Sequence, residues 1–405
     1  MLRERDIVCF SSDWSGDPTS KKHIMSRLAR GNRVLWIDSI GCRRPRATAS
    51  DARRIVQKLA AFGRGCRPVA ENVWALSPPA LPFHASPAAQ RANRLLLASR
   101  IRLAMRRLGM HDVLSWSFVP SSAVVAGALR ERLLIYHCVD EYSEFTGVDA
   151  PALLRLEARL AGRADVVFVT AERLLKSKRV FNRNTFLVRH GVDVDHFGRA
   201  LDPETAIPPD LLSGPGPVVG FFGLVADWVD LELVAHLARR RPDWQVVLIG
   251  PVVTSVAPLA GLANVRLLGR RPYAELPSYC KGFDAAILPF RINELTLAVN
   301  PLKLREYLAA GLPVVATPLP EVERYRGAVA LASDRDAFLA AVEAAVAPEN
   351  RGPRASRVEA VRDESWDAKT EELSAIVQRF LAASESRGAR RPARSLVRPP
   401  AGELT

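Results

Sequence analysis

The sequence predicts an α/β protein built from two Rossmann-like, doubly wound domains that face each other across a cleft. Apolar strand-like segments alternate with helix-like segments through both halves of the chain, and that alternation is typical of parallel sheets with helices on both faces. A Pro-rich, weakly patterned stretch at 202–217 separates the halves and is the best domain boundary. With 405 residues, 48% of them hydrophobic, the chain can bury two cores.

The first predicted domain spans 1–205. Short apolar runs predict its strands at 7–11, 33–38, 73–77, 113–117, 133–139, 166–170 and 186–188. Helices are expected at 21–30, where Gly31 ends the helix, and at 88–108. The Arg-rich stretch at 43–70 is expected to be irregular, with a helix over 52–62.

The second predicted domain spans 206–383, and a basic tail follows at 384–405. The apolar pattern predicts strands at 218–222, 244–249, 265–267, 285–288 and 314–316. Helices are expected at 231–239, 273–280, 302–309, 334–347 and 363–383. The tail holds Arg, Pro, Ser and Gly with few apolar residues, so it is expected to be disordered.

The segment 300–317 is the most informative part of the chain, and it predicts a loop, a short helix, a tight turn and a buried strand. Pro301 suits the first helical position, and Gly311 suits the left-handed residue that ends a helix. The helix start attracts anions, and Lys303 and Glu306 lie on the same side of it. This arrangement favours a ligand with phosphates and a polyol, such as a nucleotide-sugar; the alternative is an ordinary helix–strand pair with solvated charges.

This segment resembles the donor-binding motif of GT-B glycosyltransferases, in particular family 4-like enzymes. Their motif is Glu-x7-Glu followed by Ala-x-Gly-x-Pro-Val-Val-Ala; here Glu306 matches the second glutamate and 310–316 matches the tail, whereas Ala298 stands at the first glutamate. The Asn-Pro-x-Lys-x-x-Glu-Tyr-Leu-Ala pattern is similar to the subgroup of teichuronic-acid-type and exopolysaccharide enzymes. The resemblance covers most of 5–380 and implies a GT-B fold whose last helix, with Trp366, packs back on the first domain.

The resemblance also implies which residues bind the donor. Gly223 follows the first strand of the second domain and allows close backbone approach to a ligand, while Gly269 and Arg270 fall where relatives line the nucleobase pocket. No basic residue stands near Trp228, where the family often has one for the diphosphate. The implied donor-binding residues are Gly223, Gly269, Arg270, Asn300, Pro301, Leu302, Lys303 and Glu306.

Three polar side chains of the first domain are candidates for acid–base catalysis. Asp13 follows the first strand, and His137 and Asp140 stand at the end of the strand at 133–139. Such groups act when they lie within hydrogen-bond reach of the attacking hydroxyl. Helix capping is the alternative for the loop after Asp13 and for Asp140.

The net charge of +14 and the pI near 10.1 require a partner or another explanation. Nucleic acid, an anionic membrane surface and anionic sugar donors or lipid acceptors are the candidates, although an Arg-rich genome composition accounts for part of the excess. The five cysteines are widely spaced without a Cys-x-x-Cys pair, which argues against a structural zinc site and a disulfide framework and fits a reducing cytoplasm.

No signal peptide and no stretch of 18 apolar residues is recognised in the sequence, so any membrane contact is expected to be peripheral. The predicted helix at 88–108 carries six arginines among Leu, Ile and Ala, and a basic amphipathic helix can lie on an anionic bilayer. A solvated helix face is the alternative.

The sequence therefore predicts a metal-independent glycosyltransferase that needs no cofactor. It would move a sugar from a nucleotide-sugar, UDP-linked, to a sugar or lipid-linked hydroxyl acceptor in cell-surface polysaccharide or glycolipid synthesis. It would work in the cytoplasm or at the inner face of the plasma membrane. A non-catalytic GT-B-like scaffold and a basic nucleic-acid-binding protein are the alternatives; the second lacks a basic stripe with interleaved aromatic residues, so nucleic acid is not an expected partner.

Overall fold

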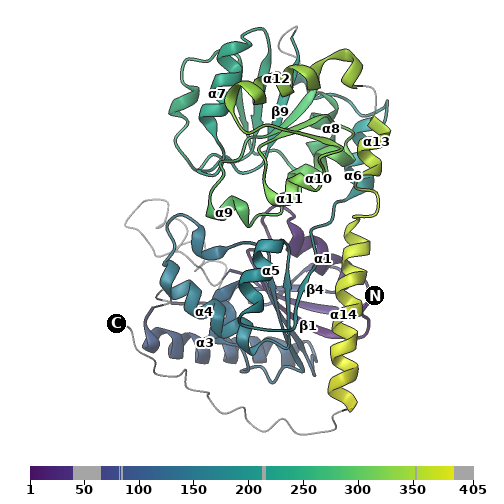
Figure 1. The fold of residues 1–405 in the computed structure, drawn as a ribbon. Coiled ribbons are helices and arrows are strands. Elements are labelled where there is room, and N and C mark those ends of the chain that lie inside the picture. The colour runs from purple at the N-terminus through teal and green to yellow at the C-terminus, as the bar shows by residue number, and fades with distance from the viewer. Residues whose placement is uncertain (40–64, 82, 84, 212–215, 352–353, 387–405) are drawn as a thin grey trace.

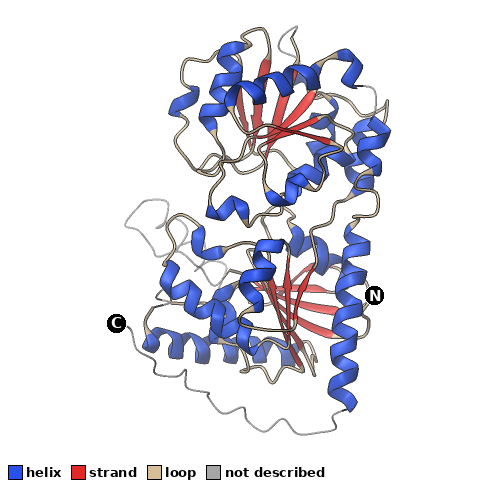
Figure 2. Ribbon diagram, viewed as in Figure 1, coloured by secondary structure: helices blue, strands red, loops and turns tan. Residues whose placement is uncertain are grey.

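The computed structural model describes residues 1–39, 65–81, 83, 85–211, 216–351 and 354–386. Two α/β domains are stacked end to end (Figure 1), and each consists of a sheet with helices packed against its faces (Figure 2). The predicted helix at 52–62 lies outside the described residues, and so does the predicted tail from 387 onward.

The first domain is an eight-stranded sheet in the order β3-β4-β2-β1-β5-β6-β7-β8. All neighbouring strands are parallel except β3 and β4. The sequence did not predict β3 because this edge strand is only half-buried and contains Pro68, a residue tolerated mainly at sheet edges. The strands are β1 (Asp6–Phe10), β2 (Arg33–Ile37), β3 (Arg67–Ala70), β4 (Val73–Leu76), β5 (Leu114–Ser117), β6 (Leu133–Cys138), β7 (Val166–Val169) and β8 (Thr185–Leu187).

The second domain is a six-stranded parallel sheet in the order β11-β10-β9-β12-β13-β14. Its central strands are fully buried, which explains their continuous apolar runs. The sequence did not predict the short edge strand β14. The strands are β9 (Val218–Phe222), β10 (Gln245–Ile249), β11 (Val265–Gly269), β12 (Ala285–Leu288), β13 (Val314–Ala316) and β14 (Val329–Leu331).

Aspartates begin several of the helices, since Asp149, Asp230 and Asp334 each accept a hydrogen bond from a first-turn backbone N–H. The helices of the first domain are α1 (Ser20–Leu28), α3 (Pro87–Arg107), α4 (Ala150–Arg163) and α5 (Glu172–Arg179). Those that follow are α6 (Val194–Gly198), α7 (Leu231–Arg240), α8 (Leu276–Lys281), α9 (Glu294–Leu297), α10 (Leu302–Ala309), α11 (Pro320–Glu323), α12 (Arg335–Val346), α13 (Arg354–Glu359) and α14 (Trp366–Ser386).

The chain passes between the domains twice, and the two passages are hydrogen-bonded to each other. The N–H of Val192 donates to the Glu364 carbonyl at 2.8 Å, and the N–H of Trp366 donates to the Val192 carbonyl at 3.1 Å. Beyond the second passage, α14 lies along the first domain (Figure 1), where Trp366 and Leu373 join that domain's core.

The first passage comes earlier than the sequence predicted. Phe197 and Ala200 are buried in the core of the second domain, so the segment that follows the first passage already belongs to that domain. The predicted boundary between 205 and 206 is therefore too late, because the Pro-rich stretch that suggested it packs on the second domain through Leu211.

We expect Gly191→Ala to lower the free energy of unfolding by about 1–3 kcal/mol, the usual cost of overpacking. A Cβ at position 191 would lie 2.9 Å from the Trp366 nitrogen and 3.0 Å from the Glu364 oxygen, so the two passages would have to separate. Gly198→Ala is the matched control, since a Cβ there meets nothing within 4 Å. Urea denaturation of both variants measures the difference, and equal stability would contradict this account.

Candidate active site at the domain boundary

Helix α10 spans 302–309 as predicted, but Pro301 lies just before its first turn instead of at the first helical position. Pro301 is its N-cap, with φ −68° and ψ 118°, and no side chain caps the helix. Since proline has no backbone N–H, the backbone N–H groups of this helix start without an intrahelical acceptor belong to Leu302, Lys303 and Leu304.

The structure brings Gly223, Lys303 and Glu306 together at the carboxyl end of β9. Lys303 Nζ lies 2.9 Å from Glu306 Oε2 and 4.9 Å from the centre of the Phe222 ring. A Cβ on Gly223 would lie 3.5 Å from Lys303 Cε, so the backbone there is open to the lysine. Glu306 is buried and Lys303 is half-buried, which leaves a cation at the edge of the sheet where doubly wound domains bind ligands.

Asn300 bonds to the first domain instead of projecting toward this cation. Its Nδ2 donates to the Thr170 carbonyl at 2.7 Å, and its Oδ1 accepts from Arg305 Nη1 at 2.5 Å. Arg305 is fully buried and also donates to Glu364 at 2.5 Å. The predicted donor-binding role of Asn300 is thus replaced by a structural bond between the domains.

The neighbours of Asn300 also pack toward the first domain. Ala298 is buried in a core cluster made of first-domain residues, and Leu302 packs against a second such cluster. Pro301 is buried as well. Of the predicted residues at 300–302, only backbone groups are therefore left for a donor.

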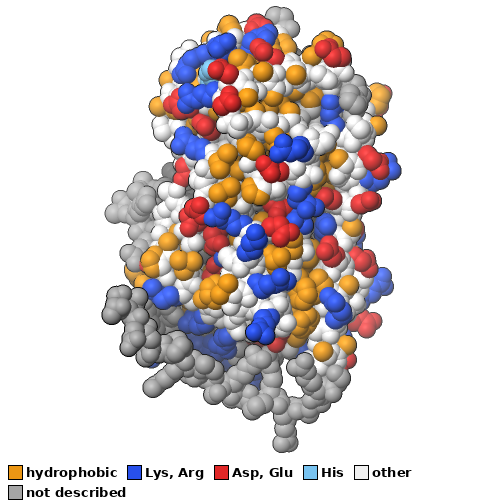
Figure 3. All heavy atoms as spheres, in the orientation of Figure 1, with side chains coloured by type: hydrophobic (Ala, Val, Ile, Leu, Met, Phe, Trp, Pro, Cys, Tyr) orange, Lys and Arg blue, Asp and Glu red, His pale blue; other side chains and the backbone are white. Residues whose placement is uncertain are grey.

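Ion pairs cross the boundary beside this segment. The carboxylate of the buried Glu321 accepts from the Glu172 backbone N–H at 2.9 Å and from Arg189 Nε at 2.7 Å, and Arg173 pairs with Glu294. Figure 3 shows basic and acidic side chains gathered along the boundary on this face. These contacts join the two domains beside the 300–317 segment.

The loop after β11 also reaches the first domain. Gly269 has φ +68° with open space around it, and Arg270 Nη2 pairs with Asp17 at 2.7 Å. Three residues after Arg270, Tyr273 stacks on His196 with ring centres 4.3 Å apart and lies 5.6 Å from His23. Gly269 and Arg270 therefore stand beside an interdomain contact.

Sequence reasoning missed the aromatic cluster around His23. This buried ring stacks on Trp366 at 5.1 Å, and burial together with Arg27 lowers its pKa to about 4. His23 is therefore uncharged at neutral pH, and it ties α1, α14 and the loop with Tyr273 together. Residues so far apart in the sequence give no local signal of this contact.

Asp13, a predicted catalytic residue, has a structural bond. Its exposed carboxylate accepts from the Ser39 backbone N–H at 3.0 Å, which joins the loops after β1 and β2. The polar loop itself was correctly placed at the end of the first strand.

His137 was predicted to act in catalysis, but the structure places its ring in the core of the first domain. It packs among Trp116, Phe118 and Phe168, and neither ring nitrogen has a hydrogen-bond partner. Burial lowers its pKa to about 3, so the ring stays neutral. The correction follows from strand alternation, which turns this side chain to a covered face.

Asp140 has the properties that His137 lacks. It is half-buried just beyond β6, and burial raises its pKa from 3.8 to about 6, with Lys21 opposing and Glu141 reinforcing the shift. A carboxyl group that titrates near neutral pH suits a general acid or base. Of the three catalytic candidates, Asp140 is the one whose partial exposure and raised pKa suit such a role.

The loop that carries Asp140 continues to the second domain. The Phe145 and Trp228 rings meet edge to face at 5.9 Å, and the Thr146 hydroxyl donates to Asp227. Trp228 therefore packs on the first domain through Phe145.

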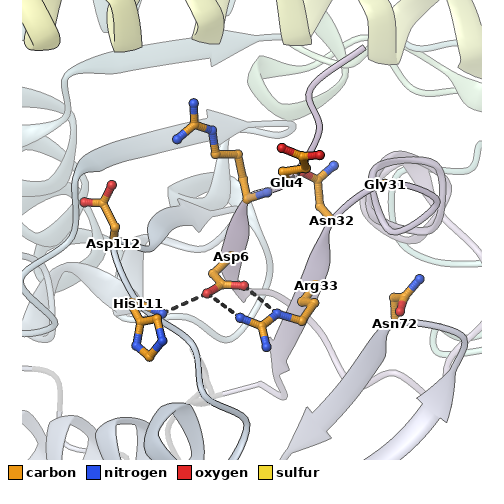
Figure 4. A pocket seen from close by; sticks show the side chains of 9 residues that line it. Glu4, Asp6, Gly31, Asn32, Arg33, Asn72, His111 and Asp112 are labelled. Carbon is orange, nitrogen blue, oxygen red and sulfur yellow. Dashed lines mark hydrogen bonds and ion pairs between the residues drawn. The ribbon is translucent and has the colours of Figure 1, made fainter.

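A separate hollow of about 400 Å³ lies at the opposite end of the first-domain sheet, where β1 and β2 begin. Figure 4 shows its floor, in which Asp6 accepts from Arg33 Nε, Arg33 Nη2 and the His111 backbone N–H, each at 2.8 Å. Because these three donors already satisfy the carboxylate, Asp6 is not free to bind a ligand in this hollow. Among the described residues, no group of three or more His, Cys, Asp or Glu could hold a metal ion.

The comparisons with known proteins agree with the fold of both domains. The model of glycosyl transferases group 1 matches residues 216–347. TuaH of Bacillus subtilis (strain 168), named as a teichuronic acid biosynthesis glycosyltransferase, is 33% identical over 229 residues, 52% of this chain and 56% of its own length. The match thus spans little more than half of that curated relative.

Solved structures extend the similarity to nearly the whole chain. Sucrose-phosphate synthase from Thermosynechococcus elongatus has a TM-score of 0.68 at 16% identity and covers 94% of this chain and 100% of its own. HepE from Anabaena, in complex with UDP and glucose, has a TM-score of 0.62 at 16% identity and covers 93% and 100%. The chain therefore has the GT-B fold, and residues 216–347, which include the 300–317 motif, are similar to the glycosyl transferases of group 1.

Proposed function

We propose that this protein is a glycosyltransferase that moves a sugar from a UDP-linked donor to a hydroxyl acceptor in the synthesis of a cell-surface polysaccharide or glycolipid. The observation that carries the proposal is the Lys303–Glu306 pair beside Gly223 at the carboxyl end of β9. The names of TuaH and of the HepE complex with UDP and glucose support it.

In this proposal the second domain binds the donor and the first domain supplies the base. Lys303 and the backbone N–H groups of Leu302 and Lys303 would neutralise the leaving diphosphate without a metal ion. Glu306 would accept hydrogen bonds from the ribose hydroxyls. Asp140, across the boundary, would take the proton of the acceptor hydroxyl.

Ala298 bears on the stereochemistry of the reaction. The first glutamate of the family motif is absent, and the alanine in its place is buried against the first domain. If Asp140 acts as the base, the anomeric centre should be inverted, whereas a retained configuration would assign Asp140 another role. NMR of the anomeric proton of the product measures this outcome.

A thermal-shift series with UDP, GDP, ADP and their sugars tests the donor. A ligand at about 100 times its Kd stabilises a protein by about 2.7 kcal/mol, so the UDP series should raise the melting temperature while the other nucleotides have little effect. UDP release from the best donor should follow. Binding of UDP without turnover would favour the non-catalytic scaffold, and no response to any nucleotide would contradict the proposal.

We also propose that α3 brings the protein to an anionic membrane surface. Arg94 donates to the Val124 and Ala126 carbonyls and Arg102 donates to Ala128, so these two arginines serve the fold. The exposed face carries the other arginines together with Leu95, whose exposed fraction is 74%. No helix among the described residues is long and apolar enough to cross a bilayer.

Binding to vesicles with anionic lipids should weaken with added salt, because exposed charges are screened within about 10 Å at 0.1 M. Replacing Arg100, Arg106 and Arg107 with Gln should weaken vesicle binding further, by about 1 kcal/mol of binding free energy per arginine. The control is Gln at Arg240, Arg324 and Arg335, which are exposed arginines of the second domain. Sedimentation with vesicles measures both, and equal binding by the two variants would contradict the role of α3.

A further inference from the structure

A buried ionic network includes Glu141, the residue that follows Asp140 in the chain. The ammonium group of Lys178, on α5, donates to both carboxylate oxygens of Glu141 at 2.8 Å and to Glu157 Oε2, on α4, at 2.9 Å. The Tyr136 hydroxyl, on β6, donates to the other oxygen of Glu157. An ammonium group has three protons, and all three are used here.

Glu141 joins this network to the loop that follows β6. It is the residue after Asp140, and it also accepts from the Ser143 hydroxyl at 3.3 Å. The Cys138 thiol donates to the Asp140 carbonyl at 3.3 Å, and the Thr170 hydroxyl donates to the Val139 carbonyl at 3.0 Å. The backbone on both sides of Asp140 is thus held from β6, β7, α4 and α5.

Burying these charges is a costly way to hold a loop. Only 3% of the side chains of Lys178 and Glu157 and 16% of that of Glu141 is exposed, and the network places one cation between two carboxylates. Well-packed apolar residues are often at least as stabilising as a buried ion pair. Stability alone therefore gives no reason for the network, whereas fixing the geometry of a functional loop does.

We infer that Lys178, Glu141 and Glu157 are positioning residues that fix the Asp140 loop, residues 139–146, against the domain boundary. The inference rests on the proposed role of Asp140 as the base. The same loop carries Phe145 and Thr146, which contact Trp228 and Asp227 of the second domain. Loosening the network would therefore displace the base and weaken the contacts that set its distance from the donor.

The network also sets the charge around Asp140. Lys21 from α1 and Glu141 from its own loop are the charged groups that act on Asp140, and Lys178 and Glu157 act through Glu141. Burial would lower the pKa of Lys178, but the negative charges of Glu157 and Glu141 raise it above its usual value, so the ammonium stays protonated. Removing the charge of Glu141 removes a repulsion that opposes ionisation of Asp140.

Glu141→Gln tests the inference in the full-length chain, because Lys178 keeps Glu157 as its partner and the fold should persist. We expect the rate of UDP release from the best nucleotide-sugar to fall on the order of 10–100-fold, with donor KM and UDP affinity unchanged. The rising limb of the pH–rate profile should move to lower pH, and amide exchange over 139–148 should accelerate. The matched control is Glu144→Gln, an exposed carboxylate of the same loop.

Lys178→Arg, which keeps the charge, should retain more of the rate than Lys178→Met, which leaves two buried carboxylates unpaired and can unfold the chain. A Glu141→Gln protein with the rate, pH profile and amide exchange of Glu144→Gln would overturn the inference. A parent protein that neither binds UDP nor releases it from any donor would overturn the proposed function instead, and the amide exchange of the two variants would then decide on the network alone.

Discussion

Replacing Asp140 with asparagine is expected to slow sugar transfer by about 10²–10⁴-fold, the usual contribution of a general acid or base, while UDP affinity stays unchanged. The base must be ionised, and the pKa of Asp140 is about 6, so the parent rate should rise with pH through that value. The rising limb should disappear in the variant. Initial rates between pH 5 and 8 measure both effects.

The same substitution should stabilise the fold at neutral pH. Folding raises the pKa of Asp140 from 3.8 to about 6, so this carboxyl favours the folded state fully below pH 3.8, and that contribution is lost as the pH rises through 6. Asparagine cannot ionise, so the gain of the variant should develop between pH 4 and 6 and persist above. Asp13→Asn, at an exposed carboxylate, is the control; a variant with full activity would remove Asp140 from the site.

Lys303→Met is expected to weaken UDP binding by about 10–150-fold, which corresponds to the 1.5–3 kcal/mol of a hydrogen bond to a charged group. The ammonium is half-buried at the carboxyl end of β9, with no other lysine or arginine in the loop after that strand, at 223–230, to replace it. Calorimetric titration with UDP measures the change. Lys176→Met, at an exposed lysine of the first domain, is the matched control.

The ion pair between Lys303 and Glu306 makes it possible to distinguish the effect of a substitution on UDP affinity from its effect on stability. Lys303→Met leaves the buried carboxylate of Glu306 without its partner, so the variant should also lose stability. The double variant with Glu306→Gln should recover that stability but not UDP affinity. Glu306→Gln alone should keep the fold and lose most activity, because an amide is a poor substitute for a carboxylate that accepts two hydroxyls. Unchanged UDP affinity in a folded Lys303→Met protein would contradict the phosphate assignment.

In the 300–317 segment, the sequence determines the local elements but not the partners of each polar side chain. The helix at 302–309, its left-handed end at Gly311 and the strand beyond it all appear as the sequence predicted, since each depends on neighbours in the chain. The sequence could not distinguish Asn300, which bonds to the Thr170 carbonyl of the first domain, from Lys303, which stays at the edge of the second-domain sheet. Both are polar residues at one helix start, and only the position of the other domain separates them.

At the end of β6, too, the sequence predicts the local structure, whereas the tertiary structure decides the roles of the side chains. The sequence by itself determined that a strand ends near residue 138 with an imidazole and two carboxylates, because apolar alternation and polar strand ends are local properties. Only the tertiary structure decided their roles: Trp116, Phe118 and Phe168 enclose His137, Lys178 and Glu157 hold Glu141, and Asp140 is left half-buried at the boundary. Burial and charge pairing depend on residues from distant parts of the chain, so the roles of these side chains emerge only when the sheet and its helices are assembled.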